Sequence, residues 1–274
     1  MINRYTVIGQ PIAHSLSPVV HQLFGEMTQR KINYSRTEST PETFEDTVLK
    51  WKASGAKGCN ITAPFKGQAA QICDRLSEEA LRAGSVNTIH MRKDGSLVGH
   101  TTDGAGLVTD IIVNRRHQIK DTRILILGAG GAARGVMQAL LKQTPSMLHV
   151  ANRTTEKAEL LARNYNDLGA VAGSGYEALS SLSGFDLLIN ATTLGMSGEM
   201  PELPVHLINP GALAYDMTYS TRDTPFMVWA RDQDASTANG LGMLVEQAAE
   251  SFLIWEDVRP KTRMVYPRLK EMLS

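Results

Sequence analysis

Short apolar runs alternate with longer amphipathic segments along the whole chain. In the first half, strand-like runs at 4–8, 32–38 and 57–61 are separated by helical patterns that open near residues 17 and 40. Two more runs, 85–91 and 97–99, flank an Asp-Gly pair that is typical of a hairpin turn. Because strands that alternate with helices build a mainly parallel sheet, the pattern predicts an α/β fold.

The same alternation continues in the second half, after a helical segment that follows Asp103. With 274 residues the chain is long enough for two compact domains. We expect a first domain over 1–103 and a second over 104–239. The last apolar-periodic segment is long enough to return to the first domain, which then includes 240–274. The strand-like runs of the second half are 123–127, 147–151, 185–190 and 212–217.

Composition and charge narrow the class of partner. Lysine plus arginine and aspartate plus glutamate both number 28, so no net positive field attracts nucleic acid or an anionic membrane. No apolar run approaches the length of a membrane span, and the first residues lack the pattern of a signal peptide. Cys59 and Cys73 have no metal-ligand spacing. We expect a cytoplasmic protein with a small-molecule partner and no metal.

A glycine-rich string directly follows the strand-like run at 123–127. The string Gly128-Ala129-Gly130-Gly131-Ala132-Ala133 has the spacing Gly-x-Gly-x-x-Ala, and a helical pattern and a second strand come next. In a dinucleotide-binding βαβ unit the first glycine allows the tight turn and the second lets the backbone approach the pyrophosphate. The helix N-terminus then faces the phosphate charge. The string therefore predicts a Rossmann-type dinucleotide site.

The residues after the second strand of this unit bear on the choice of cofactor. An NAD-binding unit usually has an acidic residue there to hold the ribose hydroxyls, but this chain has Asn152-Arg153-Thr154. Arg153 is suited to grip a 2′-phosphate, which favours NADP. The alternative is that Arg153 is a solvated surface residue and that Thr154 caps the next helix.

Polar residues in the first half cluster where predicted strands end. Ser15 and Ser17 lie at a helix start, Lys66 follows a strand and a proline, and Asn87 and Asp103 lie near the ends of the hairpin. Each of these residues alone has an ordinary structural explanation: a helix cap, a surface charge or a turn.

Together these segments resemble the shikimate dehydrogenase family, in its order and at similar spacing across nearly the whole chain. Three positions depart from the usual family pattern: Leu16 replaces a frequent lysine, Thr101 a usual asparagine and Thr193 a frequent proline. The matching stretches are Gly9 to Pro18, Asn60 to Lys66, Ala83 to Thr88, Thr102 to Gly104, Asn190 to Thr192, Leu194 to Met196, Tyr215 to Met217, and Asn239 to Gln247.

The resemblance implies a role for each matching residue. Lys66 and Asp103 would be catalytic, and Met217 and Gly240 would line the nicotinamide end of the cofactor. The residues implied in substrate binding are Ser15, Ser17 and Tyr219 for a carboxylate and Thr62, Asn87 and Gln247 for ring hydroxyls.

The function that the resemblance implies is reversible reduction of 3-dehydroshikimate to shikimate by NADPH, a step toward aromatic amino acids. Lys66 is the natural proton donor to the developing oxyanion, with Asp103 to orient it. The sequence leaves open which of the two carries the proton, and whether the enzyme is a monomer or a homodimer. The alternatives are an NAD-using quinate/shikimate dehydrogenase, which Arg153 disfavours, and a catalytically inactive sensor of shikimate-like ligands.

Overall fold

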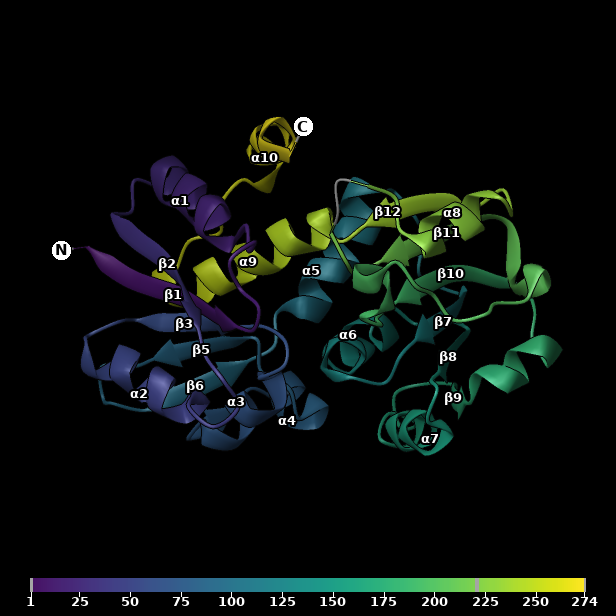
Figure 1. Ribbon diagram of the computed structural model, residues 1–274, viewed down its shortest axis with the longest axis horizontal. Coiled ribbons are helices and arrows are strands. Elements are labelled where there is room, and N and C mark those ends of the chain that lie inside the picture. Colours follow the sequence, from purple (N-terminus) through teal and green to yellow (C-terminus); the bar gives the residue numbers. More distant parts are fainter. Residues whose placement is uncertain (1, 220–221, 274) are drawn as a thin grey trace. The chain divides into compact units, whose positions relative to one another are not determined.

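The structure is a computed structural model, and it describes residues 2–219 and 222–273. The chain divides into two compact units, each drawn in Figure 1. One unit, here called the terminal unit, comprises the residues up to Gly106 and those from Leu244 onward. The other, the central unit, comprises Leu107–Met243. The division falls inside two helices, α5 (Asp103–Thr109) and α9 (Leu241–Glu256).

The terminal unit is built around a six-stranded mixed sheet of order β2-β1-β3-β5-β6-β4. β1 pairs in parallel with β2 and β3, whereas β5 is antiparallel to both β3 and β6. The strands are β1 (Asn3–Gly9), β2 (Ile32–Glu38), β3 (Gly58–Ile61), β4 (Arg75–Leu76), β5 (Thr88–Met91) and β6 (Leu97–His100). The helices are α1 (Ser17–Thr28), α2 (Phe44–Ala53), α3 (Lys66–Ile72), α4 (Glu78–Ala83), the short η5 (Thr262–Met264) and α10 (Tyr266–Leu273), together with most of α9.

Successive residues of β1 point to opposite faces of this sheet and define two apolar layers. Ile8 packs with buried residues of α2 and α3, such as Phe44 and Ala69. Tyr5 faces the other way and stacks on Trp255 of α9, with ring centroids 4.6 Å apart. Figure 1 shows α9, in yellow, beside the purple strands β1 and β2. The segment after residue 240 therefore completes the core of the unit that the N-terminal half begins, as expected.

The central unit contains a six-stranded sheet whose pairings are all parallel, in the order β12-β11-β10-β7-β8-β9. This is the doubly wound Rossmann order, with the change of direction beside the first strand. The strands are β7 (Arg123–Leu127), β8 (Met147–Ala151), β9 (Val171–Ser174), β10 (Phe185–Asn190), β11 (Ile208–Asp216) and β12 (Ser236–Asn239). The helices are α6 (Gly131–Leu141), α7 (Thr155–Arg163) and α8 (Pro225–Arg231), and the shorter turns are η1 (Asp110–Asn114), η2 (Tyr176–Ser181), η3 (Leu194–Ser197) and η4 (Val205–Leu207).

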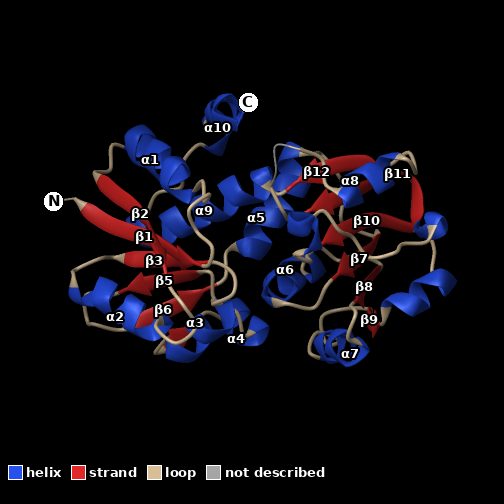
Figure 2. Ribbon diagram, in the orientation of Figure 1, coloured by secondary structure: helices blue, strands red, loops and turns tan. Residues whose placement is uncertain are grey.

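Both faces of the central sheet are covered. Ile124 and Ile126 of β7 pack with the buried side of α6, and Leu125 and Leu127 pack with α8 through Phe226. Figure 2 shows the red strands of this unit between blue helices. Because β7 is buried on both faces, its residues from Ile124 to Leu127 read as a continuous apolar run rather than an alternating one.

The predicted fold class is confirmed: an α/β chain with a Rossmann-type second sheet and a returning C-terminal helix. The first sheet, which we expected to be mainly parallel, is mixed, because β5 is antiparallel to both β3 and β6. The predicted hairpin is present as β5 and β6. In the run at 85–91, strand β5 begins only at Thr88. Asn87 still bonds to His100 and Ile61, but the backbone N–H of Val86 bonds to the carbonyl of Lys66. Across the described residues, none of the helices has both the length and the apolar character that a membrane span needs.

Candidate active site

Three segments of the terminal unit meet where β1 and β3 end. Ile8 of β1 is in register with Ile61 of β3, and the Thr62 N–H donates to the Ile8 carbonyl at 2.9 Å. The Ile61 N–H donates to the Asn87 carbonyl at 2.8 Å, which ties the segment before β5 to the same edge. Thr62 is half-buried at this edge. The carboxyl ends of neighbouring parallel strands thus gather the polar segments that the sequence singles out.

Lys66 and Asp103 form an ion pair at this edge. Lys66 is the first residue of α3 and Asp103 the first of α5. The Lys66 Nζ atom lies 2.6 Å from Asp103 Oδ2. The lysine side chain is 17% exposed and the aspartate side chain 6%, so the pair is largely, but not fully, withdrawn from solvent. An ammonium in this position is available to a bound molecule and held by the carboxylate.

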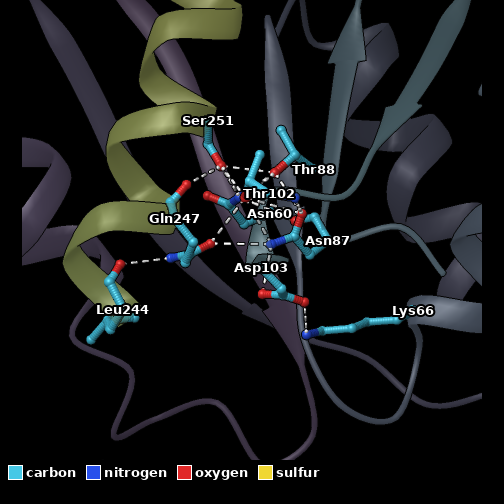
Figure 3. Close-up of polar contacts among 9 residues, drawn as sticks. All are labelled: Asn60, Lys66, Asn87, Thr88, Thr102, Asp103, Leu244, Gln247 and Ser251. Carbon is cyan, nitrogen blue, oxygen red and sulfur yellow. Dashed lines mark hydrogen bonds and ion pairs between the residues drawn. The ribbon is translucent and has the colours of Figure 1, made fainter. Parts of the chain in front are cut away.

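Asn87 connects this ion pair to helix α9. Its Nδ2 donates to Asp103 Oδ1 at 2.9 Å and to Gln247 Oε1 at 3.2 Å. Its Oδ1 accepts from the Thr102 backbone N–H at 2.8 Å. Since a backbone N–H only donates, the atom facing Thr102 is the oxygen, and the amide nitrogen must point to Asp103. Figure 3 shows the four side chains of Lys66, Asp103, Asn87 and Gln247 gathered in one place.

A second layer of buried polar groups lies behind Asn87, and the sequence analysis did not identify it as a network. Thr88 and Ser251 share a 2.7 Å hydroxyl contact, and Asn60 Nδ2 donates to both. Tyr34 donates its hydroxyl to Asn60 Oδ1 at 2.7 Å. The one sequence signal for Ser251 is its position four residues after Gln247, which places both on the same face of a helix.

Ser15 and Ser17 converge in the loop between β1 and α1. Their hydroxyl oxygens lie 3.2 Å apart, and the Ser17 N–H donates to Ser15 Oγ at 3.3 Å. The alternative that Ser17 caps the helix is wrong, because Leu16 occupies the cap position and Ser17 is the first helical residue. Arg36 of β2, which the sequence analysis missed, donates two N–H groups to the Ser15 carbonyl. The available signal was its position two residues after buried Tyr34, which places both on the same face of the strand.

The glycine-rich turn of the central unit has the geometry that a dinucleotide requires. Gly128 has φ +104°, and a Cβ there would approach the Ala191 carbonyl oxygen to 3.2 Å. Gly130 is the N-cap of α6, and a Cβ built on it meets no atom within 4 Å. The space before the helix is therefore open to a phosphate that needs close contact with backbone. Ala129, Gly131 and Ala132 belong to the same turn and first helical turn.

The three residues after β8 stand at the carboxyl edge of the central sheet. Asn152 is held by its N–H to the Ser174 carbonyl and by its Nδ2 to the Thr154 carbonyl. Arg153 is exposed. Thr154 occupies the N-cap of α7, but its side chain makes no capping bond. Burial raises the pKa of Tyr176, and the nearby positive charge of Arg153 opposes that shift. Tyr176, which sequence reasoning missed, therefore lies close enough to Arg153 for their electrostatic interaction to matter.

Met217 and Gly240 lie next to each other in the central unit. The Gly240 N–H donates to the Thr218 carbonyl at 3.1 Å, and a Cβ on Gly240 would collide with the Met217 carbonyl oxygen. This close approach requires glycine at 240. Tyr219 follows in the loop after β11 and is half-buried.

Comparison with known proteins agrees with this geometry. Residues 7–89 match the family model of the shikimate dehydrogenase substrate binding domain, and residues 110–196 match that of shikimate / quinate 5-dehydrogenase. A relative from Aeromonas hydrophila, named shikimate dehydrogenase (NADP(+)), is 48% identical over 276 residues, which cover 100% of this chain and 99% of the relative.

Solved structures show the same similarity. An Ael1 enzyme from Pseudomonas putida has a TM-score of 0.89 and 43% identity, covering 97% of this chain and 98% of its own. The shikimate 5-dehydrogenase of Thermus thermophilus, solved with NADP(H) and shikimate, has a TM-score of 0.84 and 31% identity. The match covers 95% of this chain and 96% of that enzyme's chain. The chain belongs to the shikimate dehydrogenase family.

Proposed function

We propose that this protein catalyses the reversible, NADPH-dependent reduction of 3-dehydroshikimate to shikimate. The observation that carries the proposal is the 2.6 Å contact between Lys66 Nζ and Asp103 Oδ2 at the carboxyl edge of the terminal sheet. This ion pair can carry a proton, and it lies beside the side-chain amides of Asn87 and Gln247, which can bind the hydroxyl groups of a substrate. The full-length relatives named NADP-dependent shikimate dehydrogenases support the same reaction.

Lys66 and Asp103 supply the proton as one unit. A carbonyl that becomes a hydroxyl develops negative charge on oxygen, and an ammonium held in place stabilises that charge without reorganisation. Asp103 keeps the Lys66 Nζ in position from one side, and Asn87 Nδ2 fixes the other carboxylate oxygen at 2.9 Å. In the oxidation direction the same pair accepts the proton from the substrate hydroxyl.

The terminal unit binds the substrate. Thr62, Asn87 and Gln247 hold the ring hydroxyls, since they provide hydroxyl and amide groups beside the ion pair. Ser15 and Ser17 present two neighbouring hydroxyls, which suit the two oxygens of a carboxylate. The family resemblance also implies Tyr219, a residue of the central unit, in substrate binding.

The central unit binds NADPH, which when bound supplies the hydride. The backbone from Gly128 to Ala132 holds the pyrophosphate, because Gly128 and Gly130 leave it open and α6 begins there. Asn152, Arg153 and Thr154 hold the 2′-phosphate, and the exposed guanidinium of Arg153 supplies the charge. Met217 and Gly240 line the nicotinamide end.

The proposal also includes the kind of partner, the cellular compartment and the oligomeric state. The partner is a small molecule rather than nucleic acid or a membrane, the enzyme acts in the cytoplasm, and it works as a monomer or a homodimer. Size-exclusion chromatography with light scattering distinguishes the two oligomeric states, and fractionation of the producing cell tests the compartment.

A spectrophotometric assay of shikimate and quinate with NADP and NAD tests the proposed function. We expect turnover with shikimate and NADP, with kcat/KM at least about 100-fold higher than with NAD, a difference of about 2.7 kcal/mol. If no combination of shikimate or quinate with NADP or NAD gives turnover, the alternative function, a catalytically inactive sensor of shikimate-like ligands, is supported instead. Preference for NAD with quinate would make the protein an NAD-using quinate/shikimate dehydrogenase.

A further inference from the structure

Ser251 is the point where helix α9 bonds to the polar network behind the ion pair. Its side chain is fully buried, and its Oγ lies 2.7 Å from Thr88 Oγ1, 3.0 Å from Asn60 Nδ2 and 3.3 Å from Thr102 Oγ1. It also lies 3.1 Å from the Gln247 carbonyl oxygen. Figure 3 shows dashed lines from this hydroxyl both to these neighbours and to Gln247 on the same helix.

The hydrogen-bond directions can be assigned from the groups that only donate. Because the Thr102 N–H fixes Asn87 Oδ1 as an acceptor, the 3.0 Å contact between Thr88 Oγ1 and Asn87 Oδ1 has Thr88 as its donor. Thr88 Oγ1 then has its lone pairs left for the Ser251 hydroxyl and the Asn60 amide. A directed chain therefore runs from Ser251 through Thr88 to Asn87.

The end of this chain is the carboxylate of the ion pair. With its oxygen held by Thr88 and Thr102, Asn87 can present only its amide nitrogen to Asp103 Oδ1, at 2.9 Å. Buried networks of this kind hold their members more firmly than the single bonds suggest. The Asn87 amide, held by both the Thr102 N–H and the Thr88 hydroxyl, thus links Ser251 to the carboxylate that contacts Lys66.

We infer that Ser251 is a positioning residue for the reaction: through Thr88 and Asn87 it fixes the carboxylate that orients Lys66. The inference rests on the proposed roles of Lys66 and Asp103. Ser251 also makes the local bond expected of a buried serine on a helix, since its hydroxyl lies 3.1 Å from the carbonyl four residues earlier. That carbonyl, of Gln247, is farther from Ser251 Oγ than Thr88 Oγ1 is.

The test is a panel of variants measured in the shikimate oxidation assay. We expect Ser251→Ala to lower kcat about 10-fold while the KM for shikimate changes less than about threefold, since misplacement of a catalytic group affects the transition state more than binding. Ser251→Thr, which keeps the hydroxyl, should retain kcat within about twofold. Thr88→Val should lower kcat as Ser251→Ala does, and the double variant should be no worse than either, because both break one chain.

Thr6→Val is the matched control, since Thr6 is equally buried in the same sheet. Its hydroxyl bonds to Thr37 and to the Ser35 carbonyl, which are not part of the hydrogen-bond chain from Ser251 to Asn87. It should lower the melting temperature but leave kcat unchanged. If Ser251→Ala does not fold, Thr88→Val replaces it in the test, with the same expected loss of kcat of about 10-fold.

Lys66→Met in the same panel separates the two proposals. A normal kcat for Lys66→Met would overturn the proposed catalytic roles and the inference that rests on them. Loss of kcat in Lys66→Met together with a normal kcat in Ser251→Ala would overturn the positioning role alone. Additive losses in the double variant would also count against a single chain.

Discussion

Lys66 Nζ and Asp103 Oδ2 lie 2.6 Å apart, although the two residues are 37 positions apart in the chain. Each is the first residue of its helix, and the two helices begin near the same edge of the terminal sheet. A charged pair that is only partly exposed gains from its short contact but retains access to a ligand. The pair therefore has the two properties that proton transfer requires: a fixed position and an approach for substrate.

Lys66→Met is expected to keep the fold and most of the affinity for shikimate, and to lower kcat by about 100-fold or more, the usual scale for loss of a positioned acid or base. Methionine has a similar length but no proton to give. Steady-state kinetics give kcat, and calorimetry gives the affinity. Near-normal kcat would show that another group carries the proton.

The double variant Ser15→Ala/Ser17→Ala should bind shikimate more weakly and bind NADPH normally. Hydrogen bonds to a charged group contribute about 1.5 to 3 kcal/mol each, so the dissociation constant should rise by at least about 10-fold. Isothermal titration calorimetry measures both ligands. Ser39→Ala is the control, because Ser39 is another buried serine whose hydroxyl bonds to Thr43 and Thr47. Unchanged shikimate affinity in the double variant would exclude a carboxylate site in this loop.

Arg153→Ala should lower kcat/KM for NADP by about 10-fold or more and leave the value for NAD nearly unchanged, since NAD has no 2′-phosphate to lose. The matched control is Arg163→Ala, because Arg163 is an exposed arginine in the helix that follows and pairs with Glu159. Equal losses with both cofactors would mean that Arg153 supports the fold instead.

His21 should make the stability of the protein fall in acid. It is fully buried and stacks on Tyr34 with ring centroids 4.3 Å apart, and this burial lowers its pKa from 6.5 to about 3. Between these two values the unfolded chain binds a proton that the native state excludes, so the stability present above pH 6.5 decreases as the pH falls toward 3.

The comparison variant for this effect is His21→Phe, which keeps an aromatic ring without a titratable group. The free energy of unfolding should drop between pH 7 and pH 5 by about 2 kcal/mol more in the wild type than in His21→Phe. Urea denaturation at the two pH values measures it, and the other histidines contribute equally to both proteins. An identical pH dependence in the two proteins would show that His21 is protonated in the native state.

Much of the fold could be predicted from local patterns. The runs at 32–38, 123–127, 147–151 and 185–190 match strands β2, β7, β8 and β10, because burial on one or both faces marks a strand clearly. Three of the four edge strands, β4, β9 and β12, were not predicted, whereas the fourth, the seven-residue β2, was. The three missed strands are two to four residues long and carry few apolar side chains, since an edge position needs little burial.

The candidate site was predictable in part for a similar reason. Gly128 and Gly130 can be identified by their type and spacing, because the φ of Gly128 favours glycine and the missing side chain of Gly130 leaves open space before α6. Arg36 and Ser251 have only a weak sequence signal, their shared face with Tyr34 and with Gln247, since each acts through contacts with residues far away in the chain, Ser15 and Thr88. Arginine on a strand and serine on a helix are ordinary until the tertiary fold shows what they touch.

The division of the chain has a consequence for its synthesis on the ribosome. All of the central unit, Leu107–Met243, has been translated before most of α9, which carries Gln247 and Ser251. Domains generally fold as units while the chain is still growing. The Rossmann unit can therefore reach its final form early. The sheet of the terminal unit can complete its core only after α9 has been translated, more than a hundred residues after Gly106. Nascent chains that end before Gln247 should already bind the dinucleotide but not the substrate.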